Sequence, residues 1–404
     1  RIVQYKDGKG NIVPVYRNLK DLYDWDKNFL SKVINGDNSF AKPLVDSIIK
    51  KCHSKKEIVS GIYKWVQKNI SYIAIENGLG GFIPRSPDTV FRRRYGDCKD
   101  MTCLLVSMLK AANIDAHYVW IGTRDIPYDY NKVPTSYSAN HMVVAWKDKG
   151  KYHFLDATSD YLPFGYPSTF IQDKIALIYV NDNKYDTVRV PITPATANKQ
   201  IHRIHFTLND DKLEGSDSAY VIGYLAGNIK RTYATLSSND KHDHWQNWFQ
   251  VGNNTYTLEE NSLTINPSDT ATLSCKFHIS NYAVKVGDEI YINPILDRKW
   301  NGSIIPANRK APYISDEKYA IFNQYIFTIP EGYTLKFLPK GGEDNQANFS
   351  FKITYKKIGQ NKVIATYKLI INELNTEPEN FDSWNTFAKK LKKITNQNII
   401  LKKN

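Results

Sequence analysis

Residues 95–122 read YGDCKDMTCLLVSMLKAANIDAHYVWIG, and this stretch decides the fold of the region around it. Apolar residues recur every three or four positions from Met101 to Ala112, which predicts a helix buried along one stripe. Asn113 suits the left-handed position that often ends a helix, and residues 116–122 then predict a strand. The stretch therefore predicts a helix that begins at a cysteine and leads directly into a strand.

The sequence on both sides of this stretch extends the same domain. Upstream, apolar periodicity predicts helices over 42–52 and 54–69, and the second opens with a Ser-x-x-Glu capping box. Downstream, HMVVAW (141–146) and YHFLDAT (152–158) predict two strands that are joined by turn residues. Helices followed by an antiparallel sheet are typical of an α+β domain.

A change in the pattern of apolar residues near residue 200 predicts a further domain. Alternating strand-like runs separated by turn residues dominate there, which is typical of a β-sandwich. The clearest runs cover 203–208, 270–279, 318–329, 348–357 and 362–374. A last helix is predicted over 377–393, because a Thr-x-x-Glu capping box and a proline introduce an amphipathic run.

The composition limits the classes of protein to which the chain can belong. The 404 residues exceed one ordinary core, and a hydrophobic fraction of 42% with a charged fraction of 24% is typical of globular domains. No apolar run reaches the ~18 residues that a membrane span needs. The net charge of +13 is spread along the chain except for lysines in 389–403. We interpret these lysines as a solvated helix face, with contact to lipid or a polyanion as the alternative.

The cysteines are too few and too irregularly spaced for a disulfide scaffold or a metal site. They are Cys52, Cys98, Cys103 and Cys275, without a C-x-x-C motif. No acidic cluster has the spacing of a calcium loop either. We therefore expect no metal, no cofactor and at least one free thiol.

Cys98 stands at the start of the predicted helix. A thiol is nucleophilic as its thiolate, which a helix N-terminus, nearby positive charge and an adjacent imidazole each stabilise. The helix start supplies the N-terminus, and the arginines at 92–94 are candidates for the nearby positive charge. Asp97 and Asp100 would oppose a thiolate, so we expect them to cap the helix or hold the arginines. The structural alternative for the thiol is packing behind a cap, although buried cysteines usually lie within the apolar stripe, as Cys103 does.

The two downstream strands bring a histidine and a carboxylate together. If the turn between them consists of residues 149–150, Asp156 falls on the same face of the hairpin as His141. Such diagonal neighbours have Cβ atoms roughly 7–8 Å apart, near enough for a carboxylate to accept the imidazole N–H. A three-residue turn would separate them, and a shifted register would favour Asp160. The chain order Cys98, His141, Asp156 matches that of papain-like thiol enzymes.

These residues resemble the core of the transglutaminase-like superfamily. The resemblance is carried by YGDCKD (95–100), NHMVVAW with His141 and FLDAT with Asp156. The preceding IYKWVQKNISYIAIENGLGGFIPRSPDTVF is similar to a bacterial branch of that superfamily with flanking β domains. The resemblance implies a papain-like fold in which Cys98 is the nucleophile, His141 the general base and acid, and Asp156 its orienting partner.

The resemblance also implies an organisation of the whole chain. We expect residues 1–40 to be the remnant or linker of an N-terminal β domain, 41–195 to be the catalytic domain, and 196–404 to be a β-sandwich-like domain with a terminal helix. Such proteins are exported by bacteria, so a periplasmic or cell-surface location is expected. We expect a peptide or protein substrate, no nucleic acid, and no membrane contact apart from a lipid anchor that a removed N-terminus could carry. The oligomeric state is left open.

The expected chemistry is acyl transfer through a thioester of Cys98, with His141 protonating the leaving amine. Water as acceptor gives a peptidase or amidase, and a lysine amine gives a cross-linking transglutaminase. Both use the same residues, and we favour hydrolysis because no dedicated amine pocket is recognisable. The backbone N–H of Cys98 is the first expected oxyanion donor, and the loop 76–82 could supply a second, with Asn77 as candidate.

A catalytically silent cell-surface binding protein that uses its β domain is the alternative from a different class. A cluster of exposed aromatic side chains on the β domain would favour it. Trp245, Trp248 and Trp300 are the candidates, although such residues more often belong to the core.

Overall fold

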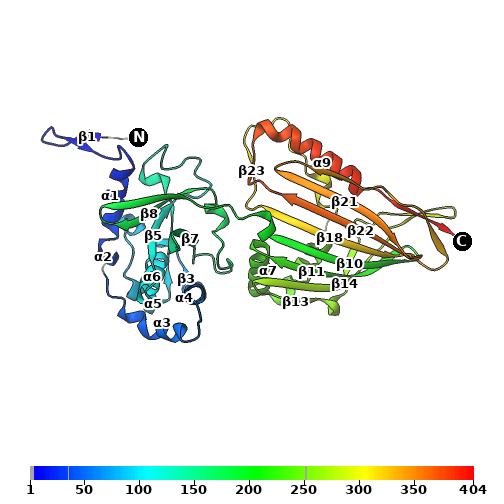
Figure 1. The fold of residues 1–404 in the computed structure, drawn as a ribbon, viewed down its shortest axis with the longest axis horizontal. Coiled ribbons are helices and arrows are strands. Elements are labelled where there is room, and N and C mark those ends of the chain that lie inside the picture. The colour runs from blue at the N-terminus through cyan, green and yellow to red at the C-terminus, as the bar shows by residue number, and fades with distance from the viewer. Residues whose placement is uncertain (1–3, 35, 251–252) are drawn as a thin grey trace. The chain divides into compact units, whose positions relative to one another are not determined.

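The computed structural model describes residues 4–34, 36–250 and 253–404 (Figure 1). The chain divides into two compact units, Arg1–Ile192 and Thr193–Asn404. This division lies close to the boundary expected after residue 195. No helix in the described ranges is long and apolar enough to cross a membrane.

The structure describes six helices in the first unit, and they include the three that were predicted above. They are α1 (Leu19–Phe29), α2 (Ser31–Ile34), α3 (Lys42–Ile49), α4 (Lys55–Asn69), α5 (Pro87–Arg93) and α6 (Cys98–Ala111). Helix α6 begins at the cysteine, as predicted. Helix α5 was not predicted, although its signal is local: Ser86 caps it and Pro87 occupies its first turn.

The first unit also contains a five-stranded antiparallel sheet in the order β7-β6-β5-β8-β9. Its strands are β5 (Ala116–Ile121), β6 (His141–Asp148), β7 (Lys151–Leu155), β8 (Ile175–Asn181) and β9 (Lys184–Arg189). Two small pairs accompany it, β1 (Gln4–Lys6) with β2 (Ile12–Pro14) and β3 (Ser71–Tyr72) with β4 (Tyr95–Gly96). Strands β8 and β9 extend the sheet beyond the three strands that were predicted.

Both faces of the central strands are buried, because successive side chains point to opposite sides. On one face Tyr118 and Val144 pack with helix α6 in the main core of the unit. On the other face Val119 and Val143 belong to a separate small cluster. Figure 1 shows α6 beside β5, where this packing occurs. Helix α6 is thus fixed against the strand that carries His141.

Helix α1 also belongs to this core. Leu22 and Tyr23 are fully buried in it, and the Tyr23 hydroxyl donates a hydrogen bond to the backbone oxygen of Lys184 at 3.0 Å. We expected residues 1–40 to be a remnant or linker. In the structure this helix is packed onto the first unit as part of its hydrophobic core.

The second unit is built on a nine-stranded sheet with the path β12-β14-β11-β10-β18-β22-β21-β20, and β13 pairs with β14. The strands are β10 (Lys199–Asn209), β11 (Lys212–Ile222), β12 (Tyr256–Leu258), β13 (Thr264–Asn266), β14 (Thr270–Ile279), β18 (Tyr319–Thr328), β20 (Gly342–Asn345), β21 (Phe349–Ile358) and β22 (Lys362–Ile371). All the strongly alternating runs noted in the sequence lie in this sheet.

A second sheet and three helices complete this unit. The sheet has the order β15-β16-β24-β19, formed by β15 (Val284–Val286), β16 (Glu289–Ile292), β24 (Ile399–Lys403) and β19 (Tyr333–Phe337). The helices are α7 (Tyr224–Thr235), α8 (Ser238–Gln250) and α9 (Phe381–Thr395), and β17 (Tyr313–Ile314) pairs with β23 (Asn375–Thr376). Residues of both sheets and of α9 share one core. Helices α7 and α8 were not predicted.

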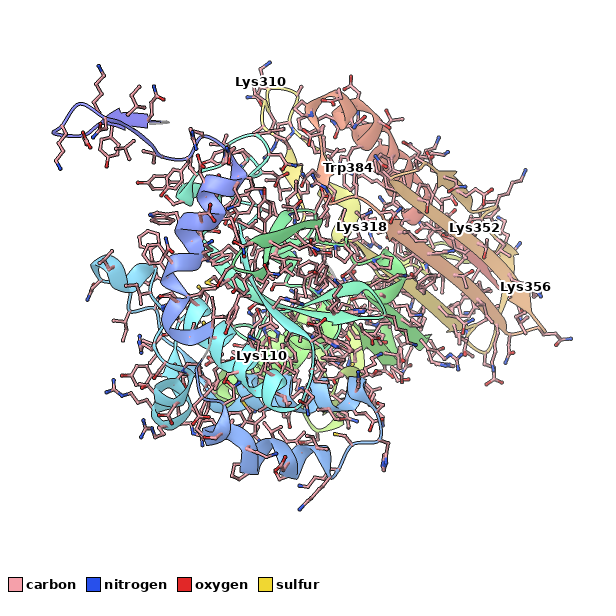
Figure 2. All side chains as sticks on the ribbon, turned by 60° about the vertical axis from the view of Figure 1, so that its left-hand side comes forward. Lys110, Lys310, Lys318, Lys352, Lys356 and Trp384 are labelled. Carbon is pink, nitrogen blue, oxygen red and sulfur yellow. The ribbon has the colours of Figure 1, made fainter. Side chains whose placement is uncertain are left out.

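The charged residues of this unit lie mostly on its outside. Lys352 and Lys356 occupy exposed positions of β21, and Figure 2 shows both along that strand. Helix α9, drawn in red in Figure 1, buries Phe381 and Phe387 while its lysines are exposed. The lysines of α9 therefore form a solvated helix face.

Candidate active site

Cys98 is held at the first turn of α6 by a reciprocal cap. The Asp97 side chain accepts a hydrogen bond from the Asp100 N–H at 3.3 Å, and the Asp100 carboxylate accepts one from the Asp97 N–H at 3.2 Å. A Cβ at Gly96 would lie 2.6 Å from the Asp100 Cβ, so the close turn requires glycine there. The cap fixes the thiol at a helix N-terminus, where the dipole favours negative charge.

Both capping carboxylates are paired with a cation, as expected, but the cations are different ones. Buried Asp97 makes an ion pair with buried Lys99. Asp100 accepts the backbone N–H of Arg85 at 2.7 Å and lies 3.4 Å from its guanidinium Nε. Burial raises the pKa of Asp100. Each of the two carboxylates beside the thiol is therefore paired with a cation.

The arginines at 92–94 do not serve these carboxylates. Arg92 makes an exposed ion pair with Asp88. Arg94 stacks its guanidinium over Trp65, 4.7 Å from the ring centroid. Arg92 and Arg94 therefore make contacts away from the two capping carboxylates.

The hairpin that carries His141 has the predicted register. Asp148 pairs with Lys151, and both Lys149 and Gly150 have positive φ, as a two-residue turn of the mirror-image type requires. His141 begins β6, and Asp156 directly follows β7. The His141 Nε2 lies 2.9 Å from the Asp156 Oδ2.

Asp156 is almost fully buried and its oxygens are saturated. Oδ2 accepts from His141 and from the Ser168 hydroxyl, and Oδ1 accepts from the N–H and the hydroxyl of Thr158 at 3.1 and 2.6 Å. Tyr63 of helix α4 donates to the Asp156 backbone oxygen at 3.0 Å. Burial alone would raise the pKa of this carboxyl, but the charge of His141 and these hydrogen bonds lower it overall.

His141 lies between this carboxylate and Cys98. Because Nε2 is bonded to Asp156, Nδ1 is the ring nitrogen left for the hydrogen bond between the side chains of His141 and Cys98. Burial alone lowers the pKa of His141, but the Asp156 charge and the hydrogen bonds with Asp156 and Cys98 raise it to about 10. Phe170 packs edge-on against the imidazole at 5.3 Å. The arrangement favours an imidazolium beside the thiol.

The alternative candidates lie elsewhere. His117 contacts the Tyr179 backbone oxygen at 3.0 Å and pairs with Asp115. Asp160 is exposed on the loop after Asp156. The shifted strand register that would have paired it with His141 therefore does not occur. Asn77 is exposed and caps a short 3-10 turn without a side-chain hydrogen bond. The structure therefore brings Cys98, His141 and Asp156 together, and it pairs neither His117 nor Asp160 with Cys98 or His141.

Several residues that support the site had little or no sequence signal. Ser168 comes from a loop far along the chain, and its hydroxyl could be assigned to Asp156 only after folding. Thr158 forms a local turn with Asp156, a contact that an Asp-x-Thr sequence could have indicated. No group of acidic, histidine or cysteine side chains in the described ranges could hold a metal ion.

The fold and the Cys–His–Asp arrangement define a papain-like thiol site on an α+β unit. Residues 42–157 match the family model of the transglutaminase-like superfamily, in agreement with the resemblance noted in the sequence. Residues 288–401 match a second family model, DUF3858, a domain of unknown function with a solved structure. No curated protein matches the chain.

Two solved structures are similar to parts or all of the chain. One is titled a "putative protease" from Parabacteroides distasonis, with 14% identity and a TM-score of 0.57, covering 100% of this chain. The other is titled a "putative cysteine protease" from Cytophaga hutchinsonii, with 20% identity, a TM-score of 0.24 and coverage of 33% of this chain. This chain spans 63% of the first structure's chain and 41% of the second's. The first similarity supports the fold.

Proposed function

We propose that the first unit is a transglutaminase-like thiol enzyme that cleaves amide bonds of peptides or proteins through a thioester of Cys98. One observation carries this proposal: His141 lies between the buried carboxylate of Asp156 and the Cys98 thiol. The solved structure with a TM-score of 0.57 is titled a "putative protease", in agreement with hydrolysis. Export from a bacterial cell, expected from the resemblance, is part of the same proposal.

The proposed reaction has two steps. The Cys98 thiolate attacks the amide carbonyl carbon, and His141 gives its proton to the nitrogen as the C–N bond breaks, so that the amine leaves. Water then attacks the thioester, gives one proton back to His141 and releases the acid and the Cys98 thiolate. Asp156 stays ionised and holds the imidazole in place. An amine in place of water would complete a transfer instead.

The test is the rate at which iodoacetamide alkylates Cys98 between pH 5 and 9, with mass spectrometry locating the label. Burial raises the pKa of the Cys103 thiol well above its ordinary range, so Cys103 is an internal control. Fast labelling of Cys98 at pH 6 that collapses in His141→Ala is expected. Labelling that rises only near the ordinary thiol pKa of about 8.5, and that ignores the variant, would contradict the proposal.

Hydrolysis and transfer are separated by a second measurement. A peptide that the enzyme cleaves is incubated with and without a large excess of a primary amine. Hydrolysis predicts the free acid as the product in both cases, because water reaches the thioester. A predominant amide product would assign the enzyme to amine transfer.

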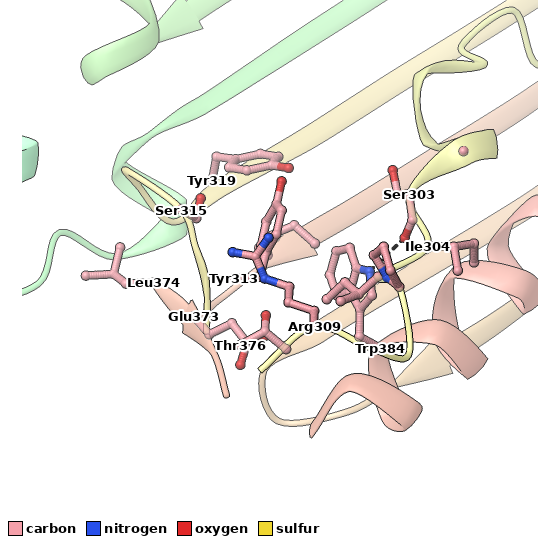
Figure 3. Close-up of a pocket in the computed structure, with 14 residues that line it drawn as sticks. Ser303, Ile304, Arg309, Tyr313, Ser315, Tyr319, Glu373, Leu374, Thr376 and Trp384 are labelled. Carbon is pink, nitrogen blue, oxygen red and sulfur yellow. Dashed lines mark hydrogen bonds between the residues drawn. The ribbon is translucent and has the colours of Figure 1, made fainter. Parts of the chain in front are cut away.

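A pocket in the second unit favours a second function, ligand binding by the β domain. It has a volume of about 280 Å³ and lies between β22, β23, α9 and the loops before β17 and β18. Figure 3 shows Arg309, Tyr313, Glu373 and Trp384 around it. Tyr313 is 48% exposed, and Arg309 lies 5.7 Å from its ring centroid. Apolar walls with a few charged groups are typical of small-molecule sites.

Trp245 and Trp248, which were candidates for an exposed aromatic cluster, do not line this pocket. Trp245 is buried in the core, and Trp248 is partly buried against His202 at a ring distance of 5.3 Å. The Trp300 side chain lies outside the described residues. Titrating amino-acid and sugar fragments while following Trp384 fluorescence, with Tyr313→Ser as control, tests the pocket. A catalytically silent binding protein would show a fragment that binds and a Cys98 that alkylates slowly.

A further inference from the structure

Residues 71–82 form an exposed apolar segment next to the proposed nucleophile. Every residue from 71 to 80 is exposed. The segment includes Tyr72 (46% exposed), Ile73 (44%), Ile75 (45%) and Leu79 (67%). Large apolar side chains that gather on one exposed segment usually mark a binding surface.

The same segment carries little charge. In a chain with 24% charged residues, residues 70–84 read ISYIAIENGLGGFIP and contain Glu76 alone. Solvated loops are normally polar, so this composition is unusual for an exposed connection. The segment therefore offers apolar contacts together with one negative charge.

The backbone of this segment has free hydrogen-bonding groups. The Ile73 N–H donates to the Gly96 oxygen at 2.9 Å, which ends the pairing of β3 with β4. Within the described part of the chain, the N–H groups of residues 74–77 have no acceptor. These residues are outside regular secondary structure and directly follow β3 along the chain. Exposed backbone with unpaired N–H groups can accept an extended peptide as an added strand.

Both ends of the segment are fixed. At one end, β3 pairs with β4. At the other end the Phe82 ring lies 5.4 Å from Phe29 and 5.2 Å from Trp25, and the Ile83 N–H donates to the Leu79 oxygen at 2.9 Å. A surface that is held in place before binding loses less conformational freedom when a ligand arrives.

The segment begins at the thiol site itself. Tyr72 pairs with Gly96, two residues before Cys98. Its hydroxyl interacts electrostatically with Cys98, Asp156 and Glu76, and burial together with these charges raises its pKa to about 12. A peptide that lies along residues 72–79 would therefore reach Cys98 directly.

We propose that residues 72–79 form a substrate edge, which binds an extended peptide with bulky apolar side chains and leads its scissile bond to Cys98. This inference rests on the proposed thioester chemistry and names its substrate class. The backbone groups of residues 74–77 pair with the peptide backbone. Ile75 and Leu79 contact its side chains, and Glu76 disfavours acidic residues.

The test uses two dipeptidyl chloromethyl ketones, one with Leu-Leu and one with Asp-Asp. The Cys98 thiolate displaces chloride from each probe, so a C–S bond replaces a C–Cl bond. The second-order labelling rate at Cys98 is measured by mass spectrometry and divided by the rate with iodoacetamide, which needs no substrate edge. The variants are Ile75→Ser and Leu79→Ser. Val284→Ser, which changes an exposed apolar residue of the second unit outside the pocket proposed above, is the matched control.

The Leu-Leu probe is expected to react at least about tenfold faster than the Asp-Asp probe. Each variant is expected to slow the Leu-Leu probe about tenfold, since losing a large apolar contact costs 10–200-fold in comparable pockets. The iodoacetamide rate and the Val284→Ser rates are expected to stay unchanged. Replacing the probe's internal peptide bond with an (E)-alkene isostere is expected to slow labelling as well, because it removes the carbonyl oxygen that the free N–H groups of residues 74–77 would bind.

The opposite results separate two failures. Fast alkylation by iodoacetamide at pH 6 with equal rates for both probes, or with no effect of the two variants, overturns the substrate edge and leaves the proposed function standing. An unchanged rate with the alkene probe overturns the backbone pairing. Slow iodoacetamide alkylation with the same rate in wild type and in His141→Ala would contradict the proposed function. It would contradict the substrate edge as well, because that inference rests on the proposed function.

Discussion

At the residue scale, the chemistry of the site depends on where one proton lies. His141 is surrounded by a carboxylate and a thiol within a largely buried site. Burial is the largest single effect on the pKa of His141 and opposes the imidazolium, but the interactions with Asp156 and Cys98 together outweigh it. Asp156 can perform this role because Ser168 and Thr158 keep it ionised and oriented.

Replacing Asp156 with Asn should lower the pKa of His141. The variant removes the charge that raises this pKa but keeps the burial that lowers it. The imidazolium should therefore be lost at a lower pH, and Cys98 alkylation at pH 6 should slow by about 100-fold or more, as for other misoriented triads. An NMR titration of the His141 ring checks the pKa directly. Ser168→Ala, which removes one hydrogen bond and no charge, should have a smaller effect.

The same residue should make stability depend on pH. The pKa of His141 in the folded chain is about 10, above the ~6.5 of an unfolded histidine. Its contribution to stability is therefore fully present below about pH 6.5 and is lost as the pH rises through about 10. Urea unfolding at pH 6 and at pH 9.5 should show a smaller difference between wild type and His141→Gln at the higher pH. An equal difference at both values would contradict this prediction.

At the element scale, the start of α6 is both a helix cap and the base of the site. Asp97 caps the helix and neutralises buried Lys99 at the same time. The hairpin β6–β7 depends in turn on a two-residue turn for its register. Each element has a local signal, and the site forms because packing brings α6 against β6.

The two roles of Asp97 can be separated by two variants. Asp97→Asn keeps a good capping side chain but leaves Lys99 without its partner, whereas Asp97→Ala loses both. Asp97→Ala should therefore lower the unfolding free energy by about 1 kcal/mol more than Asp97→Asn, which is the usual worth of a cap. Urea unfolding at neutral pH measures the difference. Ser54→Ala, at the cap of α4, gives the cost of a cap without an ion pair.

At the scale of the whole molecule, the two units have separate cores. The core residues of Thr193–Asn404 form one cluster, and those of Arg1–Ile192 form two others, with no shared members. Each unit also contains a buried free cysteine, Cys103 in the first and Cys275 in the second. These thiols can report the unfolding of each unit.

A core variant in the second unit should affect that unit alone. Phe327 is fully buried there, so Phe327→Ala should lower the unfolding free energy reported by Cys275 by about 3–5 kcal/mol. The urea dependence of Cys103 labelling should not move. The measurement is the labelling of both thiols by a maleimide across a urea series. A parallel shift of both would show that the two units unfold together.

Sequence alone determined the features that depend on neighbouring residues. Periodicity located α6, the sequence before Cys98 located its cap, and the turn at 149–150 set the register that pairs His141 with Asp156. Alternation located the long strands of the second unit. These signals are local, because a helix stripe, a cap and a two-residue turn are each encoded within a few positions.

Tertiary structure decided which distant groups meet. It assigned Lys99 and Arg85, and not the arginines at 92–94, to the carboxylates beside the thiol. It brought Ser168 to Asp156, added β8 and β9 to the sheet, and left the segment 71–80 exposed beside Cys98. Such contacts depend on which buried charges find a partner and which edges find a strand, and those outcomes are settled only when the whole unit packs.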